Sequence, residues 1–155
     1  MKTTEGQLII RDERIVIIAA RFNESIVDNL VNGALDALKR HGAGDNQLQL
    51  IRVPGAYELP LAAQRLAKSR QADGIVALGA VIRGATPHFD YVCSECASGL
   101  SRVSLKFDVP IGFGVLTCDT IEQALERAGT KAGNKGADAA MAVIEMISLL
   151  QQLGD

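Results

Sequence analysis

The sequence predicts an α/β fold, a single-domain three-layer α/β/α sandwich with a four-stranded parallel sheet in the middle layer. Short runs of consecutive apolar residues, typical of strands buried on both faces, recur four times along the chain. Each run is followed by a longer stretch whose apolar residues recur with the period of a helix. Strands and helices that alternate at these lengths form parallel sheets through right-handed crossovers. We therefore expect one domain over residues 1–155.

Four apolar runs are the expected strands. They cover residues 14–20, 48–53, 74–82 and 110–116. A strand-like piece at 7–11 precedes them, and nothing local indicates its partner. Because an unpaired strand edge invites pairing with another chain, we expect this piece to join the sheet of a neighbouring subunit. For the four main strands we expect the flavodoxin-like order.

The expected helices follow from their apolar periods and end signals. They cover residues 23–41, 57–70, 88–107, 120–128 and 133–153. Asn23 is suited to cap the first helix with its side chain, and Gly42 ends that helix. Thr120 and Gln123 have the spacing of a capping box, and Gly129 stops the helix that they begin.

Composition and charge exclude several classes of protein. The formal net charge is −2, which gives nucleic acid or an anionic membrane no electrostatic reason to bind. No apolar run is long enough to span a membrane, and charges throughout the first 14 residues leave no signal peptide. The three cysteines are an odd number, so we expect reduced thiols. These features predict a soluble cytoplasmic protein.

The carboxyl ends of the expected strands carry the candidate functional residues. Ligands of open parallel sheets bind beyond these ends. Phe22 follows the first strand, residues 55–58 the second, residues 84–88 the third and residues 117–119 the fourth. An aromatic ring, a carboxylate, a loop of backbone N–H groups and an imidazole therefore converge. Such a set suits a planar polar heterocycle together with a phosphate.

Each candidate also has an ordinary structural explanation. Phe22 could be a core residue, and Glu58 could simply complement the dipole of its helix. His88 could act as a polar cap rather than a proton shuttle. Arg127 and Lys135 could be solvated charges.

Two other motifs point more weakly to chemistry. Cys93 and Cys96 have the spacing of a redox or metal pair. They lie inside an expected helix, however, with no second pair, so we expect no metal site. Residues 130–136 resemble a phosphate loop only superficially, because they follow a helix and lack the required spacing.

Several segments carry a resemblance to a known family. They are Arg-Phe-Asn at 21–23, Val-Pro-Gly-Ala-Tyr-Glu-Leu-Pro at 53–60 and Val-Ile-Arg-Gly-Ala-Thr-Pro-His at 81–88, continued by 113–114, 121–124 and 126–136. In this order they resemble the lumazine synthase family, and the match covers nearly the whole chain from the first strand onward.

The resemblance implies a transferase-class enzyme in the penultimate step of riboflavin biosynthesis. Such an enzyme condenses 5-amino-6-(D-ribitylamino)uracil with 3,4-dihydroxy-2-butanone 4-phosphate. The products are 6,7-dimethyl-8-ribityllumazine, phosphate and water. The family needs no metal or redox cofactor, so no cofactor is expected.

The resemblance also implies roles for individual residues. The implied substrate-binding residues are Phe22, Ala56, Tyr57, Glu58, Ala80, Val81, Ile82, Gly84, Ala85, Thr86, Phe113, Arg127 and Lys135. His88 would transfer protons and Arg127 would hold the phosphate, which makes these two the implied catalytic residues. Ala80 stands where many relatives carry Thr, so only backbone contacts are implied there.

Family members build each site where two subunits meet. The resemblance therefore implies a homopentamer in which Phe113, Lys135 and Arg127 come from a neighbouring subunit. The chain has no insertion between Gly129 and Asn134. In this it resembles members that assemble into a hollow shell of sixty subunits, with riboflavin synthase as a candidate cargo.

Two other classes of function stay open from the residues alone. The first is a non-catalytic shell or carrier that binds a flavin or lumazine in the same pocket. The second is a receiver-like signalling domain of similar topology. A receiver would need an acidic cluster after the first strand, whereas residues 21–23 are Arg-Phe-Asn.

Overall fold

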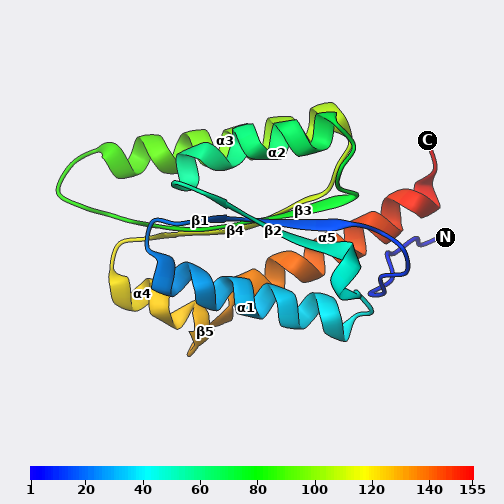
Figure 1. Ribbon diagram of the computed structural model, residues 1–155, viewed down its shortest axis with the longest axis horizontal. Helices are drawn as coiled ribbons and strands as arrows, with labels where there is room; N and C mark the ends of the chain where they lie inside the picture. The colour runs from blue at the N-terminus through cyan, green and yellow to red at the C-terminus, as the bar shows by residue number, and fades with distance from the viewer.

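A four-stranded parallel sheet lies in the middle of the molecule, between two layers of helices (Figure 1). The computed structural model describes residues 1–155. The strands are β1 (Ile15–Ala20), β2 (Leu48–Val53), β3 (Gly74–Ile82) and β4 (Ile111–Cys118). Their order is β2-β1-β3-β4, and every neighbouring pair is parallel. This order confirms the predicted flavodoxin-like α/β fold.

Helices cover both faces of the sheet. The helices α2 (Leu59–Lys68) and α3 (His88–Phe107) lie on one face, and α1 (Glu24–Arg40), α4 (Ile121–Glu126) and α5 (Lys135–Leu153) lie on the other (Figure 1). The helices that follow β1 and β3 therefore lie on opposite faces. A crevice opens where neighbouring strands send their chains to opposite faces, so the ends of β1 and β3 are the expected place for a ligand.

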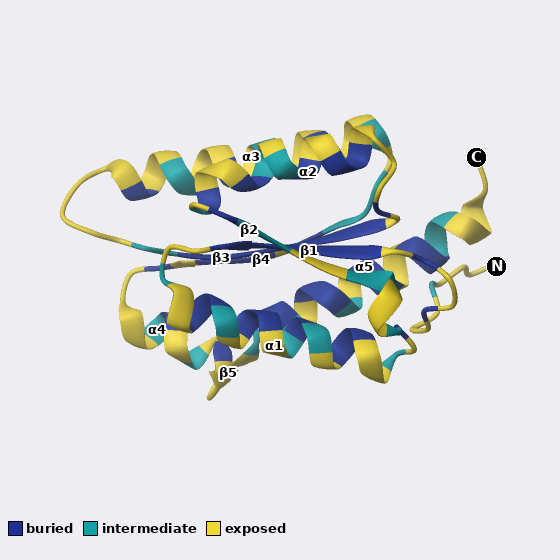
Figure 2. Cartoon of the chain, in the orientation of Figure 1, coloured by how far each residue is buried: buried dark blue, intermediate teal, exposed yellow.

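The apolar run of β1 supplies side chains to two separate cores. Ile15 and Ile17 pack with α1 and α5, whereas Val16 and Ile18 pack with α2 and α3. All residues of β1 are buried (Figure 2). Because successive side chains of a strand point to opposite faces, a strand with two cores must be apolar at every position.

The segment between α4 and α5 differs from its prediction. Here β5 (Ala128–Thr130) and β6 (Gly133–Asn134) form a short antiparallel hairpin. Gly129 and Gly133 adopt φ values of 108° and 79°, which glycine tolerates best. The Asn134 side chain then accepts hydrogen bonds from the N–H groups of Gly136 and Ala137, so α5 begins two residues later than expected. The predicted capping box of α4 is confirmed, with the Thr120 hydroxyl 3.1 Å from the Gln123 nitrogen.

Residues 7–11 form no strand within this chain, and their pairing with the sheet of a neighbouring subunit stays a prediction. The Gln7 N–H donates to the Ser148 hydroxyl of α5 at 2.8 Å, and the Ile10 N–H donates to the His41 carbonyl at 2.8 Å. A strand exists only with a partner that takes up its N–H and C=O groups. In this chain the N–H groups of Gln7 and Ile10 have acceptors at α5 and at the end of α1 instead.

None of the helices combines the length and the apolar composition that crossing a membrane requires.

Candidate functional site

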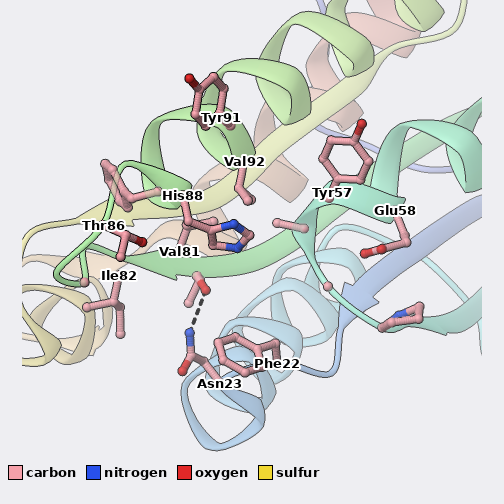
Figure 3. A pocket seen from close by; sticks show the side chains of 16 residues that line it. Phe22, Asn23, Tyr57, Glu58, Val81, Ile82, Thr86, His88, Tyr91 and Val92 are labelled. Atoms are coloured by element: carbon pink, nitrogen blue, oxygen red, sulfur yellow. Dashed lines mark hydrogen bonds between the residues drawn. The ribbon is translucent and has the colours of Figure 1, made fainter.

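A cavity of about 630 Å³ opens at the carboxyl ends of β1, β2 and β3 (Figure 3). Its lining residues are Phe22, Asn23, Pro54, Gly55, Ala56, Tyr57, Glu58, Ala80, Val81, Ile82, Gly84, Thr86, His88, Phe89, Tyr91 and Val92. This is the crevice that the strand order predicts. Its volume is typical of pockets for small molecules, which span roughly 300–1,000 Å³.

The turn between β1 and α1 presents an aromatic ring to the cavity. Phe22 is 72% exposed, so it is not a core residue. The turn is held against the end of β2, because the Arg21 and Phe22 N–H groups donate to the carbonyls of Val53 and Pro54. An exposed ring on a fixed turn is suited to stack on a planar ligand.

Asn23 does not cap α1 with its side chain, which corrects the prediction. Its backbone lies in the left-handed region, at φ 60°. The side-chain N–H₂ instead donates to the Ala80 carbonyl at 2.8 Å, drawn as the dashed line in Figure 3. Asn tolerates this backbone conformation better than most residues do. Asn23 thereby joins the β1–α1 turn to the end of β3, across the mouth of the crevice.

We expect Asn23→Asp to lower the free energy of unfolding by about 2 kcal/mol near neutral pH, because a carboxylate would face the Ala80 carbonyl without a proton between them. The penalty should shrink as the pH falls toward about 4, where a protonated carboxyl group can donate to that carbonyl. Urea unfolding at the two pH values measures both effects. Asn46→Asp, at an exposed position, is the matched control. Equal unfolding midpoints for the two variants at neutral pH would contradict the assignment.

The β3–α3 loop has the features of an anion site. The N–H groups of Gly84, Ala85 and Thr86 donate no backbone hydrogen bond. The loop leads directly into α3, whose N-terminal end carries the positive pole of the helix dipole. Gly84 and Thr86 line the cavity, whereas Ala85 does not. Unpaired N–H groups beside a helix N-terminus are suited to bind phosphate.

One face of the first turns of α3 forms a wall of the cavity. His88, Tyr91 and Val92 share this face, because residues three and four positions apart lie above one another on a helix. The site prediction included His88 and missed Pro54, Phe89, Tyr91 and Val92. The helical spacing from His88 was the signal that could have found Tyr91 and Val92.

The β2–α2 turn brings a carboxylate to the cavity. Residues Ala56–Glu58 form a 3-10 turn in which Ala56 is buried and Tyr57 exposed. Glu58 stands at the N-cap of α2, yet its side chain makes no capping hydrogen bond. In Figure 3 the Glu58 carboxylate and the His88 imidazole point toward the space between them. The carboxylate is therefore available to a ligand hydroxyl group.

Besides Ala85, three predicted residues lie outside this cavity. Phe113 is on β4, at the edge of the sheet, and is 38% exposed. Arg127 follows α4, where its Nη1 donates to the Gln123 carbonyl at 3.0 Å, and Lys135 is the first residue of α5. One chain thus brings together the aromatic ring, the carboxylate, the imidazole and the loop amides, but leaves these two cations and Phe113 elsewhere.

The cysteines lie apart from this constellation. Cys93, Cys96 and Cys118 are free, and burial raises the pKa of all three, that of Cys96 to about 12. A thiol with such a pKa stays protonated and unreactive at neutral pH. No group of three or more His, Cys, Asp or Glu side chains is arranged to hold a metal ion.

Comparison with known proteins gives a consistent result. Residues 12–151 match the family described as 6,7-dimethyl-8-ribityllumazine synthase. A relative of that name from Halorhodospira halophila is 55% identical over 154 residues, 99% of each chain. Another from Desulfovibrio desulfuricans is 55% identical over 153 residues, 99% of this chain and 98% of its own.

Proposed function

The chain belongs to the 6,7-dimethyl-8-ribityllumazine synthase family, and on this premise we propose how its cavity carries out the reaction. It is a transferase-type enzyme of riboflavin biosynthesis, and the carrier alternative is not favoured. The proposal rests chiefly on one observation. A stacking ring, a free carboxylate, an imidazole and unpaired loop amides surround a single cavity at the β1/β3 crevice.

The two substrates occupy different parts of the cavity. The pyrimidine of 5-amino-6-(D-ribitylamino)uracil stacks on Phe22, and its polar edge meets backbone groups of residues 80–82. The ribityl hydroxyl groups meet Glu58 and the turn before it. The phosphate of 3,4-dihydroxy-2-butanone 4-phosphate binds the amides of residues 84–86. This arrangement holds the amine of one substrate beside the ketone of the other.

The reaction then proceeds through proton transfers that His88 is placed to mediate. The uracil amine attacks the ketone, and loss of water gives an imine. Elimination expels inorganic phosphate and leaves a new carbonyl group. The ribitylamino nitrogen attacks that carbonyl, and water is lost again as the second ring closes. An imidazole suits these steps because it can donate and accept protons near neutral pH.

The site is completed by a second subunit. Phe113, Arg127 and Lys135 lie outside the cavity of their own chain, as expected if they serve a neighbour's cavity. We assign the chain to a homopentamer in which residues 7–11 leave α5 and pair with the next subunit's sheet. Sixty subunits would form the closed shell, with riboflavin synthase as its cargo. Light scattering of the purified protein tests the pentamer and the shell by mass.

A direct assay tests the reaction. The full-length protein is mixed with the two substrates, without metal or nucleotide, and lumazine absorbance and fluorescence are followed. Formation well above the protein-free background supports the proposal. A folded pentamer that gives no acceleration would refute it and favour the carrier. The single domain over 1–155 and a location in the cytoplasm remain predictions from the sequence.

We expect His88→Ala to lower kcat about 100-fold without abolishing turnover. Turnover persists because holding two substrates in register supplies much of the acceleration on its own. His41→Ala is the matched control, since His41 is the only other histidine and lies at the end of α1. Steady-state kinetics of the wild type and both variants gives kcat for the comparison. An unchanged kcat in His88→Ala would show that His88 does not transfer the protons.

A further inference from the structure

Arg83 lies directly before the loop of residues 84–87, and the mechanism above gives it no role. Its Nε donates to Asp119 Oδ1 at 2.8 Å, and its Nη1 lies 3.5 Å from Asp90 Oδ1. The guanidinium carbon lies 4.4 Å from the centroid of the Phe89 ring. Its backbone N–H donates to the Cys118 carbonyl at 2.9 Å. One side chain thus contacts the end of β4 and the first turn of α3.

The partners of Arg83 are themselves held in place. The Asp119 N–H donates to Gln123 Oε1 at 2.8 Å, just before the capping box of α4. Phe89 is buried and lines the cavity. Asp90 belongs to the first turn of α3, next to His88. Arg83 therefore fastens both ends of the loop to a fixed part of the fold, while the loop itself donates no backbone hydrogen bond from residues 84–86.

We propose that Arg83 is a positioning residue that holds the 84–87 loop in its phosphate-binding form through Asp119. This rests on the proposed function, in which that loop binds the phosphate of the substrate. A loop ordered in advance binds without losing conformational freedom, so its anchor lowers KM for the phosphate-bearing substrate. Two carboxylates already lie within 3.5 Å of the guanidinium group. Its positive charge is therefore paired within the protein and does not serve to bind the ligand.

The test compares Arg83→Ala, Asp119→Ala and the double variant as full-length proteins. We expect each single variant to raise KM for 3,4-dihydroxy-2-butanone 4-phosphate, and Ki for inorganic phosphate, roughly fivefold. KM for the pyrimidine substrate should stay unchanged. The double variant should be no worse than either single one, because both remove the same link.

Arg83→Lys, which keeps the charge but not the planar fork, should recover part of the loss. Arg40→Ala, which breaks an exposed pair with Asp36, should change nothing.

Three results would overturn the proposal. If Arg83 bound phosphate itself, Asp119→Ala would free it and lower Ki for phosphate while Arg83→Ala raised it. Unchanged constants in both single variants would show that the link has no effect on the loop. Equal losses for both substrates, together with a lower unfolding midpoint, would mark a purely structural role. An inactive wild type would instead refute the proposed function, which keeps the two failures distinct.

Discussion

Arg127→Ala is expected to lower kcat/KM for the phosphate-bearing substrate about 1,000-fold, a larger loss than that from His88→Ala. A guanidinium group binds phosphate through two parallel hydrogen bonds and stabilises the charge that develops as phosphate leaves. Within its own chain Arg127 is about half exposed, and only its Nη1 is engaged, donating to the Gln123 carbonyl at 3.0 Å and lying 3.8 Å from Glu126 Oε2. It is therefore free to serve a neighbouring site. Arg127→Lys should give an intermediate loss, because it keeps the charge and loses the fork.

Mixed assemblies test whether Arg127 acts across the subunit contact. We expect Phe22→Ala and Arg127→Ala subunits each to be nearly inactive alone, because every site would lack one group. If Phe22 and Arg127 of one site come from different subunits, equal co-assembly should restore about one quarter of the sites. If both came from one chain, no intact site would form. Co-expression with two different tags, followed by purification on both, gives the assemblies for the kinetic comparison. A mixture no more active than either parent would contradict the shared site.

The sequence predicted the strands well because their burial leaves little choice of residue. Strand β1 has a core on each face, so its apolar run is unbroken and easy to recognise. The strand order and the place of the cavity follow from the same pattern, since topology fixes where parallel strands end. The prediction of secondary structure was less accurate where the contacts are local and polar. The β5–β6 hairpin contains two glycines and few apolar side chains, so no period marks it.

The sequence predicted only those site residues whose position follows from the strand pattern. Residues at strand ends, such as Phe22 and Glu58, could be found by their position alone. The hydrogen bond between Asn23 and Ala80 joins residues far apart in the sequence, so no local pattern indicates it. The position of Asn23 just before a helix instead suggested a helix cap. A strand at 7–11 would need a partner outside the chain, which no local pattern specifies.

A large loss of stability is expected from Gly136→Ala, where α5 crosses α1. A Cβ atom at Gly136 would lie 2.1 Å from the Leu30 carbonyl oxygen of α1. That oxygen belongs to the backbone, so no side-chain rotation relieves the clash and the two helices must separate. We expect the free energy of unfolding to fall by about 3 kcal/mol. Because α1 carries Phe22 and Asn23 at its start, a shifted helix should also weaken binding of the pyrimidine.

Gly84→Ala is the matched control for this effect. A Cβ atom there meets nothing within 4 Å, so the same change of residue should alter the free energy of unfolding by less than about 1 kcal/mol. Urea unfolding at one fixed protein concentration gives the comparison, since assembly makes apparent stability depend on concentration. Equal losses in the two variants would contradict the clash between α1 and α5 as the cause, because the effect of Gly→Ala on the unfolded chain is stabilising. A loss confined to Gly136→Ala would instead place the cost in the close packing of α5 against α1.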